Sequence, residues 1–395
     1  MNVKRIALFL AAGALAAAVC AQGPLVPAAG PGPTMKSLAQ IEPRTAITNV
    51  PYTISQPGSY YLAGNFTSAT HGVVIATNGV TLDLMGFVLT GDGSGSGHGV
   101  YLYNASGLPV RDVAVRNGSL RRFGYGVCAK FGQGCRFEDL DASRNVWNGI
   151  LLDGLGGACD GNAIVRCSLT GNGLAAIYLN GSSSGRCSGN RIAACAVSGN
   201  ADDGISFYAA SGGACDANLV ADCTVVTNGD DGIIFNSGTG RCNGNRVSRC
   251  TVKGNAGYGV YLVGASGQCN GNAFSGCTVV GNDTYGVLLQ GSGGRCDGNV
   301  VADCAIGENG GTGLRLNVAA GNRVEHNRFY DFAGGTTYGI DCVSSTNNLI
   351  VRNSSGGQTW DYLMSARDVY GPIVTNVGEL ATNGIYAHPW ANFER

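Results

Sequence analysis

Residues 187–208 read CSGNRIAACAVSGNADDGISFY, and this stretch contains the pattern from which the fold can be inferred. It begins as Cys-x-x-Asn-x-x-x-x-Cys and reaches a glycine followed by an aliphatic residue nine positions later. The cysteine pattern occurs six times between Cys159 and Cys304, with a period of 27 or 28 residues. A repeat of that length is typical of solenoids, in which each unit packs only on its neighbours.

The step from glycine to an aliphatic residue marks one position in each repeat. Aligning the chain on this step gives eleven positions: Val73, Val100, Val127, Ile150, Ile177, Ile205, Ile233, Val260, Val287, Leu314 and Ile340. In most repeats a second apolar residue follows two positions later, which is the alternation of a strand with one buried face. Two further short strands follow in each repeat, as at Ile192 and Val197. The sequence therefore predicts an all-β, single-stranded parallel β-helix of about eleven coils, right-handed because parallel crossovers are.

Other repeat architectures do not fit this chain. A leucine-rich repeat needs the phrase Leu-x-x-Leu-x-Leu, which is missing, and a propeller needs a period above about forty residues. Helical solenoids are excluded because glycine is so frequent and no apolar period of 3.6 residues is present.

Asparagines recur at two fixed positions of the repeat. One column contains Asn145, Asn172, Asn200, Asn228, Asn255, Asn282 and Asn309, and the other contains Asn162, Asn190, Asn218, Asn245, Asn272, Asn299 and Asn322. Asparagine tolerates tight turns, and its amide can hydrogen-bond to the identical amide one coil away. We therefore expect two stacked amide ladders. The alternative is that these asparagines carry glycans or contact a ligand.

Length and charge limit the function classes. The 395 residues include 65 glycines and carry a net charge of -1, whereas nucleic-acid binding needs a basic stripe. Residues 1–21 have the basic start and apolar run of a signal peptide, which predicts a secreted, periplasmic or cell-surface protein. The apolar run is too short for a transmembrane segment. No oligomeric state is indicated.

The remaining chain divides into three parts. Residues 22–51 are predicted to be a linker rich in proline and glycine, and residues 52–353 the β-helix, with 52–71 as its N-terminal cap. Residues 354–395 are predicted to be a C-terminal capping tail, because their large aromatic side chains need an apolar surface to cover. A sorting or partner-docking role for this tail is the alternative.

The twelve repeated cysteines predict disulfides, since exported chains favour bridges over free thiols. They are Cys159, Cys167, Cys187, Cys195, Cys215, Cys223, Cys242, Cys250, Cys269, Cys277, Cys296 and Cys304. Zinc is the rival interpretation, but the spacing is unlike a Cys-x-x-Cys knuckle. Coils outside this block lose both cysteines together, which favours six bridges within coils, each worth about 2 to 4 kcal/mol. Pairing between neighbouring coils remains the alternative.

Side chains one and three places beyond the aliphatic position are expected to point outward on one flat face. This predicted glycan-binding face includes Tyr101, Tyr103, Tyr178, Asn180, Tyr208, Asn236, Tyr261 and Gln290. Tyrosine rings can stack on sugars while amides meet hydroxyl groups, which suits a polysaccharide. The alternative is that tyrosine is simply a favourable exposed residue in a strand.

Two pairs of aspartates come from adjacent coils, Asp202 with Asp203 and Asp230 with Asp231. Carboxylates stacked about 5 Å apart repel one another unless a proton or a cation relieves them. These four residues are therefore the candidates for catalytic acids or for a calcium site, and the sequence otherwise predicts no cofactor and no metal. The alternative is a solvated turn that uses aspartate as a turn former.

Residues 50–353 resemble the right-handed parallel β-helix repeat proteins of the pectate-lyase-like superfamily. The resemblance rests on Gly79–Gly86 (GVTLDLMG), on Val113–Gly118 (VAVRNG) and on the cysteine repeats. It implies lyases, hydrolases or epimerases of acidic polysaccharides among its enzymes, and members without a known reaction. The aspartate pairs resemble the acidic motifs of polygalacturonase-type hydrolases. However, Gly97-His98-Gly99 lies four coils before Asp203, and Arg315 lies three coils past Asp231, too far for one catalytic site.

These observations predict an exported β-helix that binds polysaccharide or forms a cell-surface module without catalysis. A first alternative is a lyase, hydrolase or epimerase of uronate-containing glycans centred on the four aspartates. A second is a purely structural adhesin or stalk.

Overall fold

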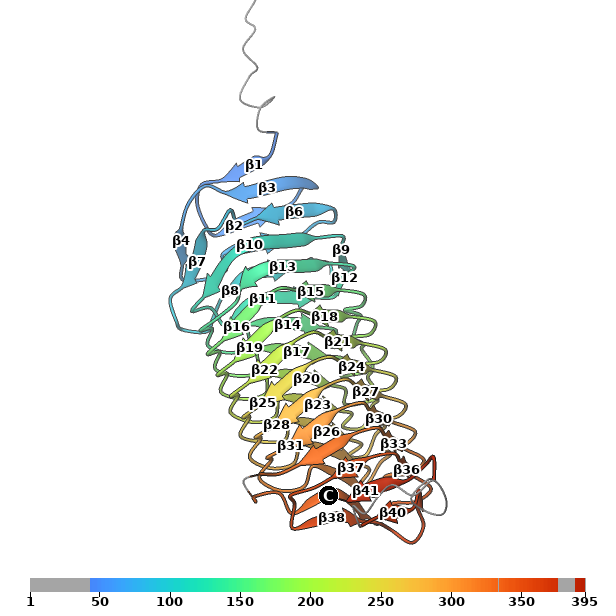
Figure 1. The fold of residues 1–395 in the computed structure, drawn as a ribbon. Coiled ribbons are helices and arrows are strands. Elements are labelled where there is room, and N and C mark those ends of the chain that lie inside the picture. Colours follow the sequence, from blue (N-terminus) through green and yellow to red (C-terminus); the bar gives the residue numbers. More distant parts are fainter. Residues whose placement is uncertain (1–42, 333, 376–387, 395) are drawn as a thin grey trace, which may run out of the picture. The chain divides into compact units, whose positions relative to one another are not determined.

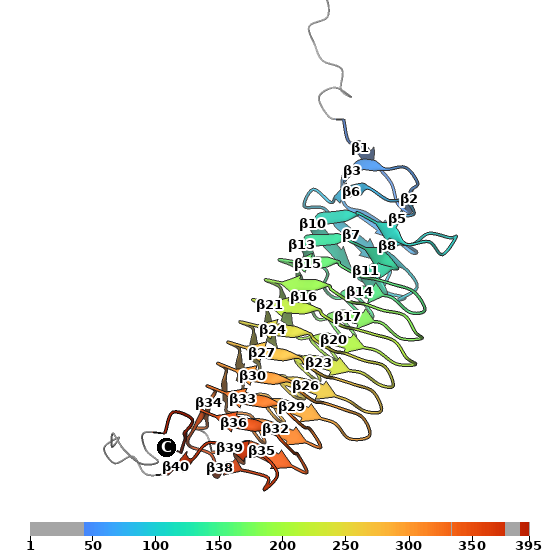
Figure 2. The same ribbon diagram turned by 90° about the vertical axis from the view of Figure 1, so that its right-hand side faces the viewer.

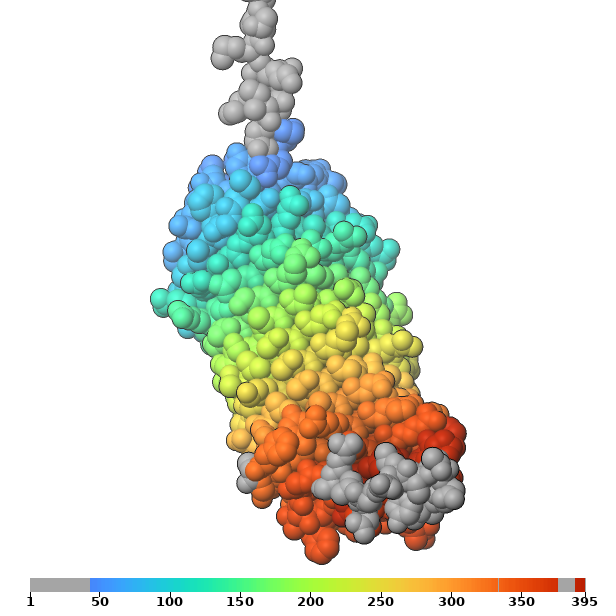
Figure 3. All heavy atoms as spheres, in the orientation of Figure 1, coloured from blue at the N-terminus to red at the C-terminus, as the bar shows by residue number. Residues whose placement is uncertain are grey.

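The computed structural model describes residues 43–332, 334–375 and 388–394. The predicted signal peptide and most of the predicted linker lie outside these residues. From Thr45 onward the described chain winds into a parallel β-solenoid, and all of its regular structure is β (Figure 1). This confirms the predicted fold class. The space-filling view shows consecutive coils as successive bands of colour (Figure 3).

One wall of the solenoid is a parallel sheet of thirteen strands, with one strand from each coil. Eleven consecutive strands contain the eleven predicted aliphatic positions, and one more strand lies at each end. The strands are β2 (Tyr52–Ile54), β5 (Val73–Ile75), β8 (His98–Leu102), β11 (Tyr125–Lys130), β14 (Ile150–Asp153), β17 (Ile177–Asn180), β20 (Ile205–Tyr208), β23 (Ile233–Asn236), β26 (Val260–Val263), β29 (Val287–Gln290), β32 (Leu314–Asn317), β35 (Tyr338–Val343) and β38 (Trp360–Leu363).

In each coil, the strand of the second wall comes after the strand of the thirteen-stranded sheet and the turn that follows it (Figure 2). Its strands are β1 (Thr45–Ile47), β3 (Gly58–Leu62), β6 (Val80–Asp83), β10 (Ala114–Arg121), β13 (Arg136–Asp141), β15 (Ala163–Val165), β18 (Arg191–Ala193), β21 (Leu219–Ala221), β24 (Arg246–Ser248), β27 (Ala273–Ser275), β30 (Val300–Ala302), β33 (Arg323–Glu325), β36 (Leu349–Val351) and β39 (Val369–Tyr370).

The third wall joins the second at its N-terminal end, where β10 pairs with both β6 and β7. Its strands are β4 (Phe66–Ser68), β7 (Val88–Gly91), β16 (Ser168–Thr170), β19 (Ala196–Ser198), β22 (Thr224–Val226), β25 (Thr251–Lys253), β28 (Thr278–Val280), β31 (Ala305–Gly307), β34 (Arg328–Tyr330), β37 (Ser354–Ser355), β40 (Ile373–Val374) and β41 (Asn392–Glu394). A separate two-stranded pair is formed by β9 (Val110–Arg111) and β12 (Gly132–Gln133).

Equivalent apolar residues of successive coils form continuous interior rows. Ile205 is in register with Ile233, which is in register with Val260, and all three are buried. In the next row the rings of Phe207 and Phe235 stack with centroids 4.4 Å apart. The predicted winding about a single axis is thereby confirmed, because residues one period apart are direct neighbours.

The glycine before each aliphatic residue is required by a close backbone approach. A Cβ atom at Gly204 would lie 2.6 Å from the carbonyl oxygen of Gly232 and 2.4 Å from Val225 Cγ1. Gly232 and Gly259 are equally crowded by the glycine of the next coil. The repeated glycine therefore reflects the tight stacking of coils at this corner.

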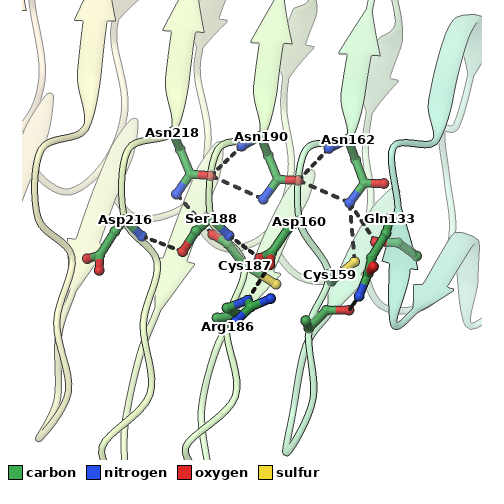
Figure 4. A network of polar contacts seen from close by, with 12 residues as sticks. Gln133, Cys159, Asp160, Asn162, Arg186, Cys187, Ser188, Asn190, Asp216 and Asn218 are labelled. Carbon is green, nitrogen blue, oxygen red and sulfur yellow. Dashed lines mark hydrogen bonds and ion pairs between the residues drawn. The ribbon is translucent and has the colours of Figure 1, made fainter. Parts of the chain in front are cut away.

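Both predicted asparagine columns form buried amide ladders. Asn162 Nδ2 donates to Asn190 Oδ1 at 3.0 Å, and Asn190 Nδ2 donates to Asn218 Oδ1 at 3.1 Å (Figure 4). This ladder continues through Asn322 to Asn348 and ends on the carboxylate of Asp368. The other column forms the same bonds from Asn145 to Asn309. Each amide replaces the water that a buried backbone donor would otherwise need.

The cysteines contradict the predicted bridges within coils. All fifteen described cysteines are free and buried. Cys187 Sγ lies 3.2 Å from the carbonyl oxygen of Leu152 in the thirteen-stranded sheet, whereas Cys195 Sγ lies 3.6 Å from that of Ile164 in the second wall. The two sulfurs of one coil thus occupy different corners with a three-residue strand of about 10 Å between them. A disulfide needs Cα atoms within about 7 Å.

The cysteines instead form two vertical columns. The first thiol column comprises Cys159, Cys187, Cys215, Cys242, Cys269 and Cys296, and the second comprises Cys167, Cys195, Cys223, Cys250, Cys277 and Cys304. Asn327 and Asn353 continue the corner of the second column as an amide ladder that ends on Asn392.

The solenoid extends beyond both predicted ends. β1 lies within the range predicted to be a linker, and its Ile47 is fully buried. The predicted capping tail contributes β38, whose Tyr362 packs against the core and donates to the Phe393 carbonyl oxygen at 2.9 Å. Trp360 does not share in this cover, since it is 62% exposed on the outside of β38.

Candidate functional site

The outer surface of the thirteen-stranded sheet contains a cavity of about 320 Å³ near its middle. Strands β17, β20 and β23 provide its floor, and the turns that precede β14, β17 and β20 provide its rim. The lining residues are Asn148, Leu174, Ala175, Tyr178, Asp202, Asp203, Ser206, Tyr208, Ile234 and Asn236. Three predicted glycan-binding residues and two predicted acidic residues thus share one cavity.

The four predicted aspartates are stacked on adjacent coils, as expected. Carboxylate oxygens of Asp202, Asp203 and Asp230 all lie within 4.8 Å of one another. Asp203 Oδ1 accepts a hydrogen bond from the backbone nitrogen of Asp231 at 3.2 Å. Asp231 Oδ1 accepts one from the backbone nitrogen of Tyr258 at 2.7 Å. Backbone donors therefore hold these carboxylates in place.

Two of these carboxyl groups are buried, which sets their protonation. Asp203 is 8% exposed and Asp231 is 3% exposed. Burial, reinforced by the charge of Asp202, raises the pKa of Asp203 to about 7. Burial also raises the pKa of Asp231 to about 8, although the hydrogen bond from Tyr258 opposes this. Both groups can hold a proton near neutral pH.

The same carboxylates can bind a cation instead of protons. Asp202, Asp203 and Asp230 offer three converging oxygen ligands at the edge of the cavity. Calcium prefers carboxylate and other oxygen ligands and takes six to eight of them. Three negative groups therefore fit part of a calcium shell, with the remaining positions left to water or to a ligand.

No basic side chain lines the cavity within the described residues. His98 lies on β8, four strands along the sheet from β20, and its pKa is lowered to about 4 by burial and by the neighbouring His71. Arg315 lies on β32, where it donates to the Tyr285 hydroxyl at 2.8 Å and pairs with Asp341 at 3.5 Å. The expected separation of these groups from the aspartates is confirmed.

The other predicted glycan-binding residues lie along the same sheet on both sides of the cavity. Tyr101 and Tyr103 are stacked with ring centroids 5.0 Å apart at an interplanar angle of 3°. Asn180 Nδ2 donates to Asp153 Oδ1 at 3.3 Å. On the other side, the Tyr261 hydroxyl donates to Gln290 Oε1 at 3.3 Å. The eight residues follow the sheet from β8 to β29, and three of them reach the cavity.

Sequence reasoning missed several residues of this surface. Trp147 packs edge-on against Tyr125 with centroids 5.0 Å apart, so an aromatic cluster extends from His71 to the cavity rim. Leu174 and Asn148 also line the cavity. Trp147 and Leu174 lie three residues before the aliphatic position of their coils, which is the repeat position that Asp202 and Asp230 occupy in the later coils. Asn148 occupies the same repeat position as Asp203, two coils later. This shared position was the signal that could have identified Asn148.

Among the described residues, no helix has the length and hydropathy that a membrane-spanning segment needs.

Comparisons with known proteins agree with this architecture. No curated protein sequence matches the chain. Of the solved structures, a mannuronan C-5 epimerase A-module (AlgE6) from Azotobacter vinelandii is 16% identical, with a TM-score of 0.55, covering 82% of this chain and 86% of that one. DFA-IIIase from Arthrobacter chlorophenolicus A6, without its lid, is 12% identical, with a TM-score of 0.59, covering 79% and 87%.

A third structure with the same fold is a tailspike protein of E. coli bacteriophage HK620 in complex with pentasaccharide. It is 13% identical, with a TM-score of 0.51, and the match covers 76% of this chain and 60% of the tailspike. At these identities the likeness concerns the fold alone. The family model described as "right handed beta helix region" matches residues 65–214, 98–296 and 267–356. These matches span most of the solenoid, and the chain belongs to the right-handed β-helix family.

Proposed function

We propose that this protein binds a polysaccharide, without catalysis, along the outer face of the thirteen-stranded sheet. The observation that carries the proposal is the cavity in which Tyr178, Tyr208 and Asn236 surround two aspartates. Tyrosine rings offer flat apolar surfaces with a polar edge, and the amide and carboxylates offer partners for sugar hydroxyls. This combination suits a neutral or hydroxyl-rich glycan in the cavity itself.

The extent of the face favours an extended ligand over a small sugar. Tyr101 on β8 and Tyr261 on β26 are separated by six strand spacings, or roughly 29 Å. Aromatic residues therefore lie along the sheet well beyond the cavity. The names of the similar structures support a carbohydrate ligand, since one is a mannuronan epimerase and another holds a pentasaccharide.

Calorimetry against a panel of uronate-containing and neutral polysaccharides tests this proposal. We expect binding that weakens about tenfold in Tyr178→Ala and in Tyr208→Ala, a loss of about 1.4 kcal/mol each. Tyr330→Ala is the matched control, because Tyr330 is a partly buried tyrosine on β34 in the third wall. Absence of binding to every glycan would favour a purely structural adhesin or stalk instead.

A second candidate function is cleavage or epimerisation of a uronate-containing glycan at the aspartate cluster. The observation that favours it is the pair of buried carboxyl groups, Asp203 and Asp231, beside a cavity of sugar size. A carboxyl group whose pKa lies near the working pH can donate and recover a proton during a reaction. The lack of a basic partner in the cavity places this function second.

Product assays separate catalysis from binding. Incubation with uronate polysaccharides, followed by detection of new reducing ends, unsaturated products and epimerised residues, is expected to show no turnover. Turnover that disappears in Asp203→Asn and Asp231→Asn, with glycan binding retained, would replace the binding proposal with the enzymatic one.

We also propose that the protein acts outside the cytoplasm, as its N-terminal sequence predicts. Polysaccharides of cell walls and surfaces are accessible there. Mass determination of the mature N-terminus tests this point, with cleavage expected after Ala21.

A further inference from the structure

Two thiol columns cross six consecutive coils, and the proposed function uses neither of them. Backbone pairing keeps successive cysteines of the second column in register. The carbonyl oxygen of Cys167 accepts a bond from Ala196 at 2.9 Å, and that of Cys195 accepts one from Thr224 at 3.0 Å. The first column is held in the same way by parallel bridges, such as Ala158 with Arg186. Equivalent residues of neighbouring coils therefore lie about 4.8 Å apart.

That separation lies within the Cα distance of about 4.4–6.8 Å that disulfides require. The side chains are also aligned, because the thiol of Cys195 interacts with those of Cys167 and Cys223 on the two neighbouring coils. In the first column, Cys242 interacts in the same way with Cys215 and Cys269. Figure 4 shows Cys159 and Cys187 on consecutive coils beside the amide ladder.

The columns do not fit a metal site. Within the described residues, the one group of three or more converging metal-ligating side chains is the aspartate cluster. In a vertical column of cysteines, a metal ion between two neighbouring sulfurs would have only two ligands. Zinc takes four ligands in a tetrahedron. The geometry of the columns thus suits pairwise bonds.

The number of cysteines makes the pairing unique. Each column has six members, and bonds between adjacent coils can use all six in one way only. We propose that on oxidative folding the columns form six disulfides between adjacent coils. In the second column these are Cys167–Cys195, Cys223–Cys250 and Cys277–Cys304, and in the first Cys159–Cys187, Cys215–Cys242 and Cys269–Cys296.

The oxidant is a soluble disulfide such as oxidised glutathione. One cysteine thiolate attacks it to form a mixed disulfide and releases one thiolate. The neighbouring cysteine thiolate then attacks the protein sulfur of that mixed disulfide and releases the second. Each bridge thus consumes one external disulfide, and the two cysteine protons end on the two released thiols.

In this proposal the disulfides form while the coils assemble during folding. In the closed solenoid the thiols are buried, and the Cys167 thiol together with burial raises the pKa of Cys195 to about 12. Thiolate attack is then slow. A coil that has just docked on its neighbour brings two cysteines together before the next coil covers them.

Peptide mapping of the full chain tests this proposal. The chain is refolded in a mixture of oxidised and reduced glutathione, unfolded in denaturant with an alkylating agent, digested without reduction and analysed by mass spectrometry. We expect the six named cross-links and three alkylated cysteines, Cys128, Cys135 and Cys342. The register partners of Cys128 and Cys342 are Leu151 and Leu316, and Cys135 stands at the position of the asparagine ladder, with its backbone nitrogen donating to Asn162 Oδ1. Recovery of a Cys187–Cys195 peptide, or of all twelve column thiols alkylated, would overturn the proposal.

Two double variants give an independent test by counting free column thiols. Cys167→Ala with Cys195→Ala removes one complete pair, so no column thiol is left free. Cys195→Ala with Cys223→Ala breaks two pairs, so two thiols of the second column become free. Pairing within coils predicts two free thiols of the first column in both variants. Equal counts in the two variants therefore contradict bridges between coils.

Discussion

Asn218 Oδ1 accepts two hydrogen bonds from Asn190, one from its backbone nitrogen at 2.8 Å and one from its side-chain Nδ2 at 3.1 Å. Both residues are buried, so this oxygen is the partner of two donors that water does not reach. The same relationship repeats on every coil of the ladder and joins neighbouring coils at a corner where no strand pairs.

Removal of one ladder amide is expected to cost more than an ordinary hydrogen bond. Asn218→Ala leaves two buried donors of Asn190 without a partner, and each orphaned donor costs about 1–3 kcal/mol. We expect the free energy of unfolding to fall by about 2–4 kcal/mol in denaturant titration. Thr170→Ala is the control, because it removes an exposed hydroxyl contact with Ser198 and should change stability by less than about 0.5 kcal/mol. A loss below 1 kcal/mol for Asn218→Ala would show that water replaces the amide.

The stacked interior phenylalanines predict a large cavity effect. Phe235→Ala removes a fully buried ring that packs on Phe207 and Phe274, and such changes cost about 3–5 kcal/mol. Phe332→Ala is the matched control, since Phe332 is 78% exposed and should contribute little. Chemical denaturation of both variants measures the difference. Similar stabilities for the two variants would contradict the continuous core row.

The buried aspartates predict a stability that decreases as pH rises. The pKa values of Asp203 and Asp231 are raised to about 7 and about 8, whereas an unfolded aspartate has a pKa of about 3.9. At pH values between these pKa values, the folded state therefore binds more protons than the unfolded state. Their contribution is complete below about pH 4 and is lost as pH rises to about 8.

The measurement is the unfolding free energy of wild type and of the double variant Asp203→Asn, Asp231→Asn at pH 5 and pH 8. Asparagine keeps an acceptor for the bonds from Asp231 and Tyr258 and carries no charge. We expect a drop of at least about 1 kcal/mol in wild type and a flatter profile in the variant. Asp283→Asn, at an exposed position, is the control and should retain the wild-type slope.

Calcium is expected to reverse this loss at high pH. At pH 8 the carboxylates of Asp202, Asp203 and Asp230 favour a divalent cation, and a ligand that binds only the folded state raises the melting temperature. We expect millimolar calcium to stabilise wild type but not Asp202→Asn with Asp230→Asn. An unchanged melting temperature of the wild type would show that calcium does not bind at this site.

The length of the tyrosine face predicts a dependence on ligand length. Tyr101 lies at the far end of the face, so Tyr101→Ala should weaken binding of long chains by about tenfold and leave short oligosaccharides unaffected. Tyr178→Ala should weaken both, because Tyr178 lines the cavity. Calorimetry with a size series of one glycan measures this. Equal effects of Tyr101→Ala on short and long ligands would contradict a single extended binding path.

Much of this architecture could be predicted because one period relates every residue to its neighbours. The interior row through Ile205 and both asparagine ladders follow directly from that period. The cysteine partners could not be derived in this way, since a fixed period is compatible with pairing within and between coils. The three-residue strand between Cys187 and Cys195 argues against pairing within coils, and only the structure shows both corners.

The candidate site was predicted less completely than the fold. The aspartates and tyrosines follow the period and were found. Trp147 and Leu174 share the repeat position of Asp202 and Asp230, but they were missed because an apolar side chain in a turn does not by itself indicate a binding site. The start of the solenoid was also missed, because the three residues of β1 are too few to show a period. Whether residues on one face reach a common cavity depends on turn geometry, which the repeat pattern does not contain.

The asparagine ladder has a direction, because every side-chain amide donates toward the next coil. Its dipoles are therefore aligned, and the last donor meets the carboxylate of Asp368, a group that only accepts. A duplicated coil inserted in the middle would find the same acceptor on one side and the same donor on the other. Truncation before residue 368 would leave the side-chain N–H of Asn348 without this acceptor. The length of this solenoid is thus modular in its interior, while its terminus depends on one acidic residue.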